Sequence, residues 1–262
     1  MTLKHKLDLI HQEYNQREFV SPDPLEFLYA YPQVRDREIA GLVAALLAYG
    51  RVAQILKSVA RVLDLLGPSP HEYLLTRTEA DIVQDLKGFK HRFTTDGHMT
   101  DLLVGAGKVL HRFGSLEACF LSGFSSEDET VIPAMSHFIK ELTRGGKMGI
   151  LAADPERRSA CKRNNLFLRW MVRKDQVDPG GWAEVPSSAL VVPLDTHMFR
   201  IGTLLGFTRQ KQANLKTALE ITRGFRDLIP NDPVKYDFCL TRFGIRGEMN
   251  HDDLKAILSN DL

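Results

Sequence analysis

The sequence contains only three cysteines in 262 residues, and this scarcity excludes several classes of site. Cys119, Cys161 and Cys239 are far apart, and no Cys-x-x-Cys pair occurs. Zinc ribbons and cysteine-ligated iron–sulfur clusters need grouped thiolates, so we expect neither a metal site nor a cluster. Three scattered thiols also give no disulfide framework, and we expect them to be reduced and mostly buried.

Long apolar runs and a strong net charge are also absent. No stretch of about 18 apolar residues occurs, which excludes a membrane-spanning helix, and residues 1–6 are too polar for a secretion signal. We therefore expect a cytoplasmic protein without a membrane partner. The net charge of +1 is low for a dedicated nucleic-acid binder, although residues 155–174 alone carry seven Lys or Arg residues.

The sequence also lacks the alternation of apolar and polar residues that is typical of strands. Its segments with helical periodicity are separated by short stretches rich in Pro, Gly and Asp. Apolar residues repeat with helical spacing from Asp36 to Gly50 and from 55 to 66. The pairs Asp154-Pro155 and Asp232-Pro233 resemble helix starts, so we expect one helix to run from 155 through Lys162 and another to cover about 233–243. The chain is predicted to be all-α, one two-lobed unit over 1–262. Residues 30–145 form one lobe, and 1–29 together with 146–262 form the other.

The most informative segment is Pro193-Leu194-Asp195-Thr196-His197, followed by Arg200 and by Leu205-Gly206. Asp195 precedes a helical pattern, and a helix N-terminus holds a carboxylate in its ionised form. A lone Asp at this place is usually a plain N-cap. The segment nevertheless resembles the helix-hairpin-helix DNA glycosylases, whose Pro-x-Asp-Thr-His-x-x-Arg signature carries the catalytic Asp. The resemblance implies a two-lobed glycosylase-like fold with Asp195 as the catalytic carboxylate.

Lys162 is the second residue that this resemblance selects. In the bifunctional members of the superfamily, a lysine that opens the second helix of the hairpin attacks the deoxyribose C1′ and forms a Schiff base. Lys162 lies 33 residues before Asp195, a long separation that is similar to the archaeal 8-oxoguanine glycosylase branch. The whole chain resembles a bacterial family of unknown function related to that branch. We expect the amine of Lys162 and the carboxylate of Asp195 to face one cleft within about 4–6 Å.

Two further groups of residues follow from the same resemblance. The usual Gly-x-Gly hairpin turn is absent from 155–160, so cationic and hydroxyl side chains are expected to bind DNA instead. These residues are Arg158, Ser159, Arg163 and Arg169. The damaged-base pocket is expected to include Tyr49, Trp170, Trp182 and His197.

The resulting prediction is a monomeric base-excision repair glycosylase with AP-lyase activity, which needs no cofactor. It would act on an oxidised purine, 8-oxoguanine in particular, in double-stranded DNA. Two alternatives remain open at this point. The missing hairpin glycines and the low net charge favour a non-catalytic helical module that binds nucleic acid or protein. A monofunctional glycosylase would instead use Asp195 to activate water, with Lys162 contacting only phosphate.

Overall fold

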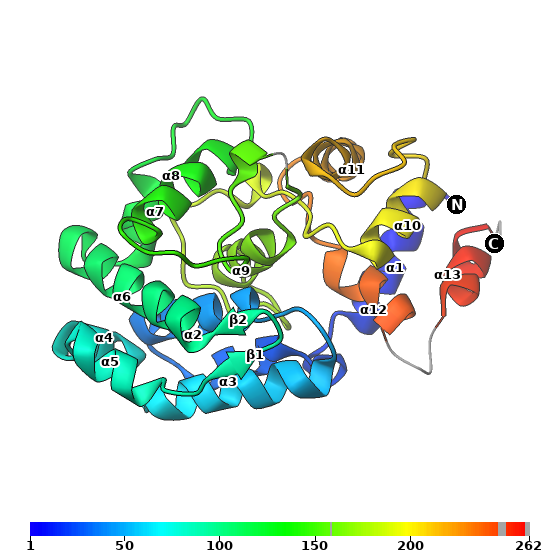
Figure 1. Ribbon diagram of the computed structural model, residues 1–262. Coiled ribbons are helices and arrows are strands. Elements are labelled where there is room, and N and C mark those ends of the chain that lie inside the picture. Colours follow the sequence, from blue (N-terminus) through cyan, green and yellow to red (C-terminus); the bar gives the residue numbers. More distant parts are fainter. Residues whose placement is uncertain (158, 246–249, 260–262) are drawn as a thin grey trace.

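The computed structural model describes residues 1–157, 159–245 and 250–259, and it is 62% helical with 2% strand (Figure 1). The predicted all-α character is confirmed. The α-helices are α1 Leu3–Tyr14, α2 Val34–Leu46, α3 Val52–Leu66, α4 Pro70–Thr76, α5 Glu79–Asp85, α6 Asp96–Phe113, α7 Leu116–Leu121, α8 Ile132–Leu142, α9 Lys162–Val172, α10 Thr196–Leu204, α11 Leu215–Leu228, α12 Asp237–Ile245 and α13 His251–Ser259. The short elements are the 3₁₀ turns η1 Arg17–Phe19, η2 Pro24–Ala30, η3 Pro155–Arg157 and η4 Ser187–Ala189, and the strands β1 Lys90–His91 and β2 Thr94–Thr95.

The helices gather in two groups (Figure 1). Helices α2 to α8 lie on one side, and α10 to α13 lie on the other side with α1. The N-terminal helix packs on α12 and α13, where the Lys6 amine donates to the Leu258 carbonyl at 2.7 Å. Two elements expected in the second lobe pack on the first one, since η2 contacts α2 and α3 and α9 contacts α2. Helix α9 therefore packs with the first group of helices, and it lies next to the second group.

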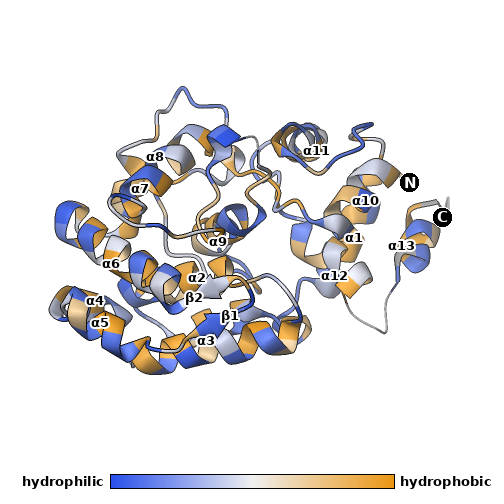
Figure 2. Ribbon diagram, viewed as in Figure 1, coloured by the Kyte–Doolittle hydropathy of each residue, from blue (hydrophilic) through white to orange (hydrophobic). Residues whose placement is uncertain are grey.

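The contact between α2 and α9 is close because a glycine lies at its centre. A Cβ at Gly41 would lie 3.4 Å from the Met171 sulfur and 3.4 Å from the Phe167 ring. The Phe167 ring packs edge-on against Trp182, with ring centroids 5.1 Å apart. The apolar face of α9 is therefore fixed in the core of the first group. Helix α3 also has an apolar and a polar face, and Figure 2 shows hydrophobic and hydrophilic residues along its length.

Two predicted helix starts are wrong. The helix expected from Pro155 is a single 3₁₀ turn, and a separate helix begins at Lys162. The break comes at Cys161, which adopts the left-handed conformation with φ of 45°. The helix expected from Pro233 begins at Asp237 instead. Asp232 accepts a hydrogen bond from Arg173 at 3.0 Å, so its carboxylate serves an ion pair with α9.

Candidate active site

Asp195 is the N-cap of α10, and one of its two carboxylate oxygens carries out the capping. Oδ1 accepts hydrogen bonds from the backbone N–H groups of His197 and Met198, both at 2.9 Å. These N–H groups have no partner within the helix, so the cap both starts α10 and fixes the orientation of the carboxylate. The second oxygen, Oδ2, is left facing the neighbouring helix α9.

Lys162 meets that second oxygen from the first position of α9. Its Nζ lies 3.5 Å from Asp195 Oδ2, and the side chains are 38% and 17% exposed, respectively. The amine is thus accessible to a molecule from outside, while the acid is more sheltered. The structure brings together the two residues that the sequence analysis selected, from helices that belong to different groups. The two groups form an ion pair, and a slightly closer approach, to roughly 2.6–3.2 Å, would let them exchange a proton.

The loop before Lys162 is fixed by side chains from the helix that follows it. Asn164 donates to the Ala153 carbonyl at 2.8 Å, and Asn165 donates to the Ala160 carbonyl at 3.1 Å. Both Asn side chains are buried, so these bonds tie the loop firmly to the first turn of α9. Ser159 accepts from the Cys161 backbone N–H at 3.2 Å, and it lies on the exposed side of the loop. The position of Lys162 is therefore set by its own helix and by a braced loop.

A cavity of about 460 Å³ opens beside Lys162. Ala48, Tyr49 and Gly50 at the end of α2 form one wall, and residues 159–163 form another. Ala153 and Ala213 complete the lining, which consists mostly of small side chains. The volume falls within the range of pockets that bind small molecules, roughly 300–1,000 Å³. Of the residues expected in the base pocket, Tyr49 is the one that shares this cavity with Lys162.

Tyr49 is held rigidly in the cavity wall. Its hydroxyl donates to the His91 carbonyl at 2.8 Å and lies 2.7 Å from Thr94 Oγ1. The His91 ring is fully buried, and it contacts the Tyr49 carbonyl at 3.0 Å and Ser58 Oγ at 2.9 Å. Burial lowers the pKa of His91, so its imidazole is neutral near pH 7. Sequence reasoning missed this support, since a histidine without ligand spacing carries no signal of its contacts.

Comparison with protein families gives one match. Residues 23–246, which include every residue of the cavity and both members of the Lys162–Asp195 pair, match the family model described as "Protein of unknown function (DUF2400)". The chain belongs to the DUF2400 family. No curated protein and no solved structure matches it. The chemistry of this DUF2400 protein therefore has to be inferred from its own residues.

Arg163, which the sequence analysis assigned to DNA, is already occupied within the DUF2400 fold. Its guanidinium donates to the Leu46 carbonyl at 2.7 Å and also to the Ile150 carbonyl. The group also lies over the Tyr49 ring, 4.9 Å from its centroid. Burial lowers the pKa of Arg163. The side chain therefore braces the cavity wall, and its phosphate-binding role is not supported.

Arg169 is a second correction. It is 4% exposed, and it pairs with Asp178 at 3.2 Å and with Asp237 at a shorter distance. Arg173 lies beside it and pairs with Asp178 and Asp232. This buried network joins α9 to α12, and it leaves Arg169 inaccessible to DNA. Burial raises the pKa of Asp237 to about 6, with the charge of Asp195 acting in the same direction and Arg169 opposing both.

The other expected residues occupy different surroundings. Trp170 and Trp182 have 0% exposed surface, so neither ring can stack on a base. The Trp182 indole donates to Glu38 at 3.0 Å, inside the core. The ring of His197 lies against Gly244 of α12, where it helps to seat α10. Arg158 lies outside the described residues.

Among the described residues, no group of three His, Cys, Asp or Glu side chains is arranged to hold a metal ion. Within the same part of the chain, the helices are too short or too polar to cross a lipid bilayer.

Proposed function

We propose that this protein is a DNA glycosylase with AP-lyase activity, in which Lys162 is the nucleophile and Asp195 the proton acceptor. The observation that carries the proposal is the 3.5 Å contact between Lys162 Nζ and Asp195 Oδ2 at the edge of a cavity. An amine attacks only after it loses a proton, and a base within direct reach can take that proton. The capped carboxylate of Asp195 supplies such a base in a fixed orientation.

The reaction begins with the target nucleotide turned out of the duplex, since the reacting sugar is inaccessible within the stack. Asp195 first takes a proton from the Lys162 ammonium. The neutral amine then forms a bond to C1′, and the N-glycosidic bond breaks with its electron pair leaving on the base, which takes the proton from Asp195. The attached nitrogen loses its extra proton to O4′ as the C1′–O4′ bond breaks, which gives an iminium ion. Asp195 then accepts a C2′ proton, and the electron pair expels the 3′ phosphate. Water hydrolyses the remaining imine, so the products are the free base, a nicked strand and the free Lys162 amine.

The cavity is the proposed place of the extruded base. Tyr49 forms part of the wall, with the Arg163 guanidinium over its ring, so the base would contact the exposed part of this pair. The small side chains around it, Ala48, Gly50 and Ala160 among them, leave room for a bicyclic ring. We propose an oxidised purine as the substrate, and 8-oxoguanine is the first one to test.

Sodium borohydride trapping on a duplex that contains 8-oxoguanine tests the proposal, because borohydride reduces the imine to a stable covalent adduct. The wild-type protein should form the adduct, and Lys162→Gln should form none. Lys174→Gln is the matched control, since Lys174 is an exposed lysine that follows α9 at its other end. An adduct that persists in Lys162→Gln refutes the nucleophile assignment.

The two alternatives give different results in the same reaction. A monofunctional glycosylase releases free base and leaves an unbroken abasic strand, without an adduct. A non-catalytic module binds without releasing base from any oxidised duplex. The occupied guanidiniums of Arg163 and Arg169 remove two of the expected DNA contacts, which favours the form of this alternative in which the module binds protein.

A further inference from the structure

The occupied Arg163 and Arg169 leave open how a DNA strand would be held next to Lys162. In most complexes, DNA-binding proteins take much of their affinity from Lys and Arg side chains on backbone phosphates. Among the described residues, several Lys and Arg side chains line surface depressions other than the Lys162 cavity. Their positions relative to Lys162 identify a second surface.

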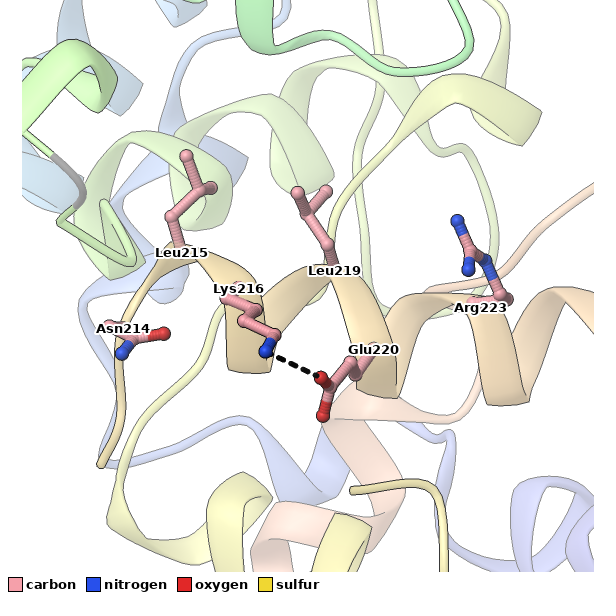
Figure 3. Close-up of a pocket in the computed structure, with 6 residues that line it drawn as sticks. All are labelled: Asn214, Leu215, Lys216, Leu219, Glu220 and Arg223. Atoms are coloured by element: carbon pink, nitrogen blue, oxygen red, sulfur yellow. Dashed lines mark ion pairs between the residues drawn. The ribbon is translucent and has the colours of Figure 1, made fainter. Parts of the chain in front are cut away.

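One depression lies against α11 and has a volume of about 610 Å³. We call it the α11 groove, and its lining is Asn214, Leu215, Lys216, Leu219, Glu220 and Arg223. Figure 3 shows Leu215, Leu219 and Arg223 on one side of the helix and the Lys216–Glu220 ion pair beside them. Consecutive residues line the two sites, since Ala213 lines the Lys162 cavity and Asn214 lines the groove.

Two further depressions share lining residues with these sites. Leu219 and Arg223 also line a smaller one, of about 260 Å³, that reaches Thr130 and Pro133 at the start of α8. The Lys162 cavity shares Ser159 and Arg163 with a further depression of about 590 Å³ that contains Lys147 and Arg157. Depressions lined by cations therefore lie next to the Lys162 cavity as well as along α11.

The charge of this lining suits a polyanion. Lys and Arg outnumber Asp and Glu by eight to three among the described lining residues, whereas the whole chain has a net charge of only +1. Lys147, Arg157 and Arg223 are exposed, and none of these three is within ion-pair distance of an acid in the part of the chain that the structure describes. The Lys216 amine lies 4.0 Å from the Glu220 carboxylate, and 71% of the Lys216 side chain is exposed.

We infer that the α11 groove binds the sugar–phosphate backbone of the DNA strand next to the target nucleotide, with Lys216 and Arg223 on its phosphates. The inference rests on the proposed function, and it assigns the phosphate contacts to α11 and away from Arg163 and Arg169. Both residues are exposed on a well-packed helix, whose buried face includes Ala218, Ile221 and Phe225. Their substitution should therefore leave the fold unchanged.

The experiment measures equilibrium binding, by fluorescence anisotropy, to a labelled duplex that carries a stable abasic-site analogue. The affinity of the wild-type protein should fall with salt, with a slope in log–log form of about 0.9 per phosphate contacted. The double variant Lys216→Gln/Arg223→Gln should bind more weakly and lose roughly two units of slope. Lys108→Gln, an exposed lysine of α6 in the other group of helices, is the matched control and should bind as the wild type does.

A double variant with the wild-type affinity and slope overturns the inference, as does an equal loss in Lys108→Gln. Binding of the duplex without salt dependence also overturns it, because phosphate contacts release counterions. Failure of the proposed function appears separately. In that case the wild-type protein binds the duplex through α11 and yet gives no borohydride adduct.

Discussion

The two carboxylate oxygens of Asp195 have different partners. One caps α10, and the other faces the Lys162 amine. Oδ1 accepts the two capping hydrogen bonds of α10, whereas Oδ2 lies 3.5 Å from the Lys162 amine. The geometry of the cap thus orients the acid for the amine. A substitution can remove the charge and keep the cap, which separates structure from chemistry.

Asp195→Asn should abolish the proposed activity at little cost in stability. Asn is as good an N-cap as Asp, because its amide oxygen accepts the same backbone hydrogen bonds. The amide cannot take a proton from Lys162, so the rate of adduct formation should fall at least about 100-fold. Single-turnover borohydride trapping measures the rate, and urea unfolding measures the stability.

Asp195→Ala provides the contrast. It removes the cap as well, which should cost about 0.5–2 kcal/mol of unfolding free energy relative to Asn. Equal activity in the Asn variant and the wild type would reduce Asp195 to a plain helix cap.

Much of the fold could be predicted from the sequence because local rules govern it. The apolar periods at 39–47 and 55–66 correspond to α2 and α3, and Gly67 ends the second of them. The left-handed backbone at Cys161 could not be predicted, since β-branched, apolar and thiol residues adopt it only under tertiary constraint. Cys161 is the N-cap of α9, and its left-handed backbone makes Lys162 the first residue of that helix.

The proximity of Lys162 and Asp195 could be predicted because a motif selected both residues, whereas the surroundings of Arg169 could not. Lys162 and Asp195 were found from a family signature. The local sequence indicates that Arg169 is a surface cation on a basic helix. Its partners Asp178 and Asp237 lie 9 and 68 residues away, so the local sequence does not reveal the ion pairs. Burial and pairing of this kind depend on the tertiary structure, and composition around Arg169 gives no sign of them.

Arg169→Met should therefore destabilise the protein without acting on DNA binding directly. The substitution leaves Asp178 and Asp237 buried without their common partner, and breaking a buried ion pair in this way costs about 3–5 kcal/mol. Urea unfolding at neutral pH gives the change in free energy. Arg223→Gln serves as the control because its side chain is exposed, and it should unfold as the wild type does. Wild-type stability of Arg169→Met would show that the network is dispensable.

Gly244→Ala should move α10 and the acid with it. A Cβ at Gly244 would lie 1.9 Å from Nδ1 of His197, and the ring has to shift to admit it. Because His197 follows Asp195 by two residues, the shift should slow adduct formation, and overpacking should cost about 1–3 kcal/mol. Gly97→Ala is the control, since the nearest atom to its added methyl is 3.8 Å away. Equal effects of the two substitutions would contradict the seating role of His197.

Glu38 should make stability fall as the pH rises from weakly acidic to neutral. Burial raises the pKa of Glu38 from 4.5 to about 7, although the N–H groups of Leu116, Glu117 and Trp182 donate to its carboxylate. The folded state therefore holds a proton that the unfolded state has already lost between these two pH values. The stability contributed by this proton is complete below about pH 4.5 and disappears as the pH rises through about 7.

Glu38→Gln removes this titration, so the comparison of the two proteins isolates it. The unfolding free energy of the wild type minus that of Glu38→Gln should be larger at about pH 5 than at about pH 8, by on the order of 2–3 kcal/mol. Asp237, whose pKa burial raises to about 6, titrates in the same window, but it is present in both proteins and cancels in the difference. Urea unfolding at the two pH values gives all four free energies. A difference that grows with pH would mean that the three N–H donors outweigh burial, and that Glu38 is an ionised cap for α7.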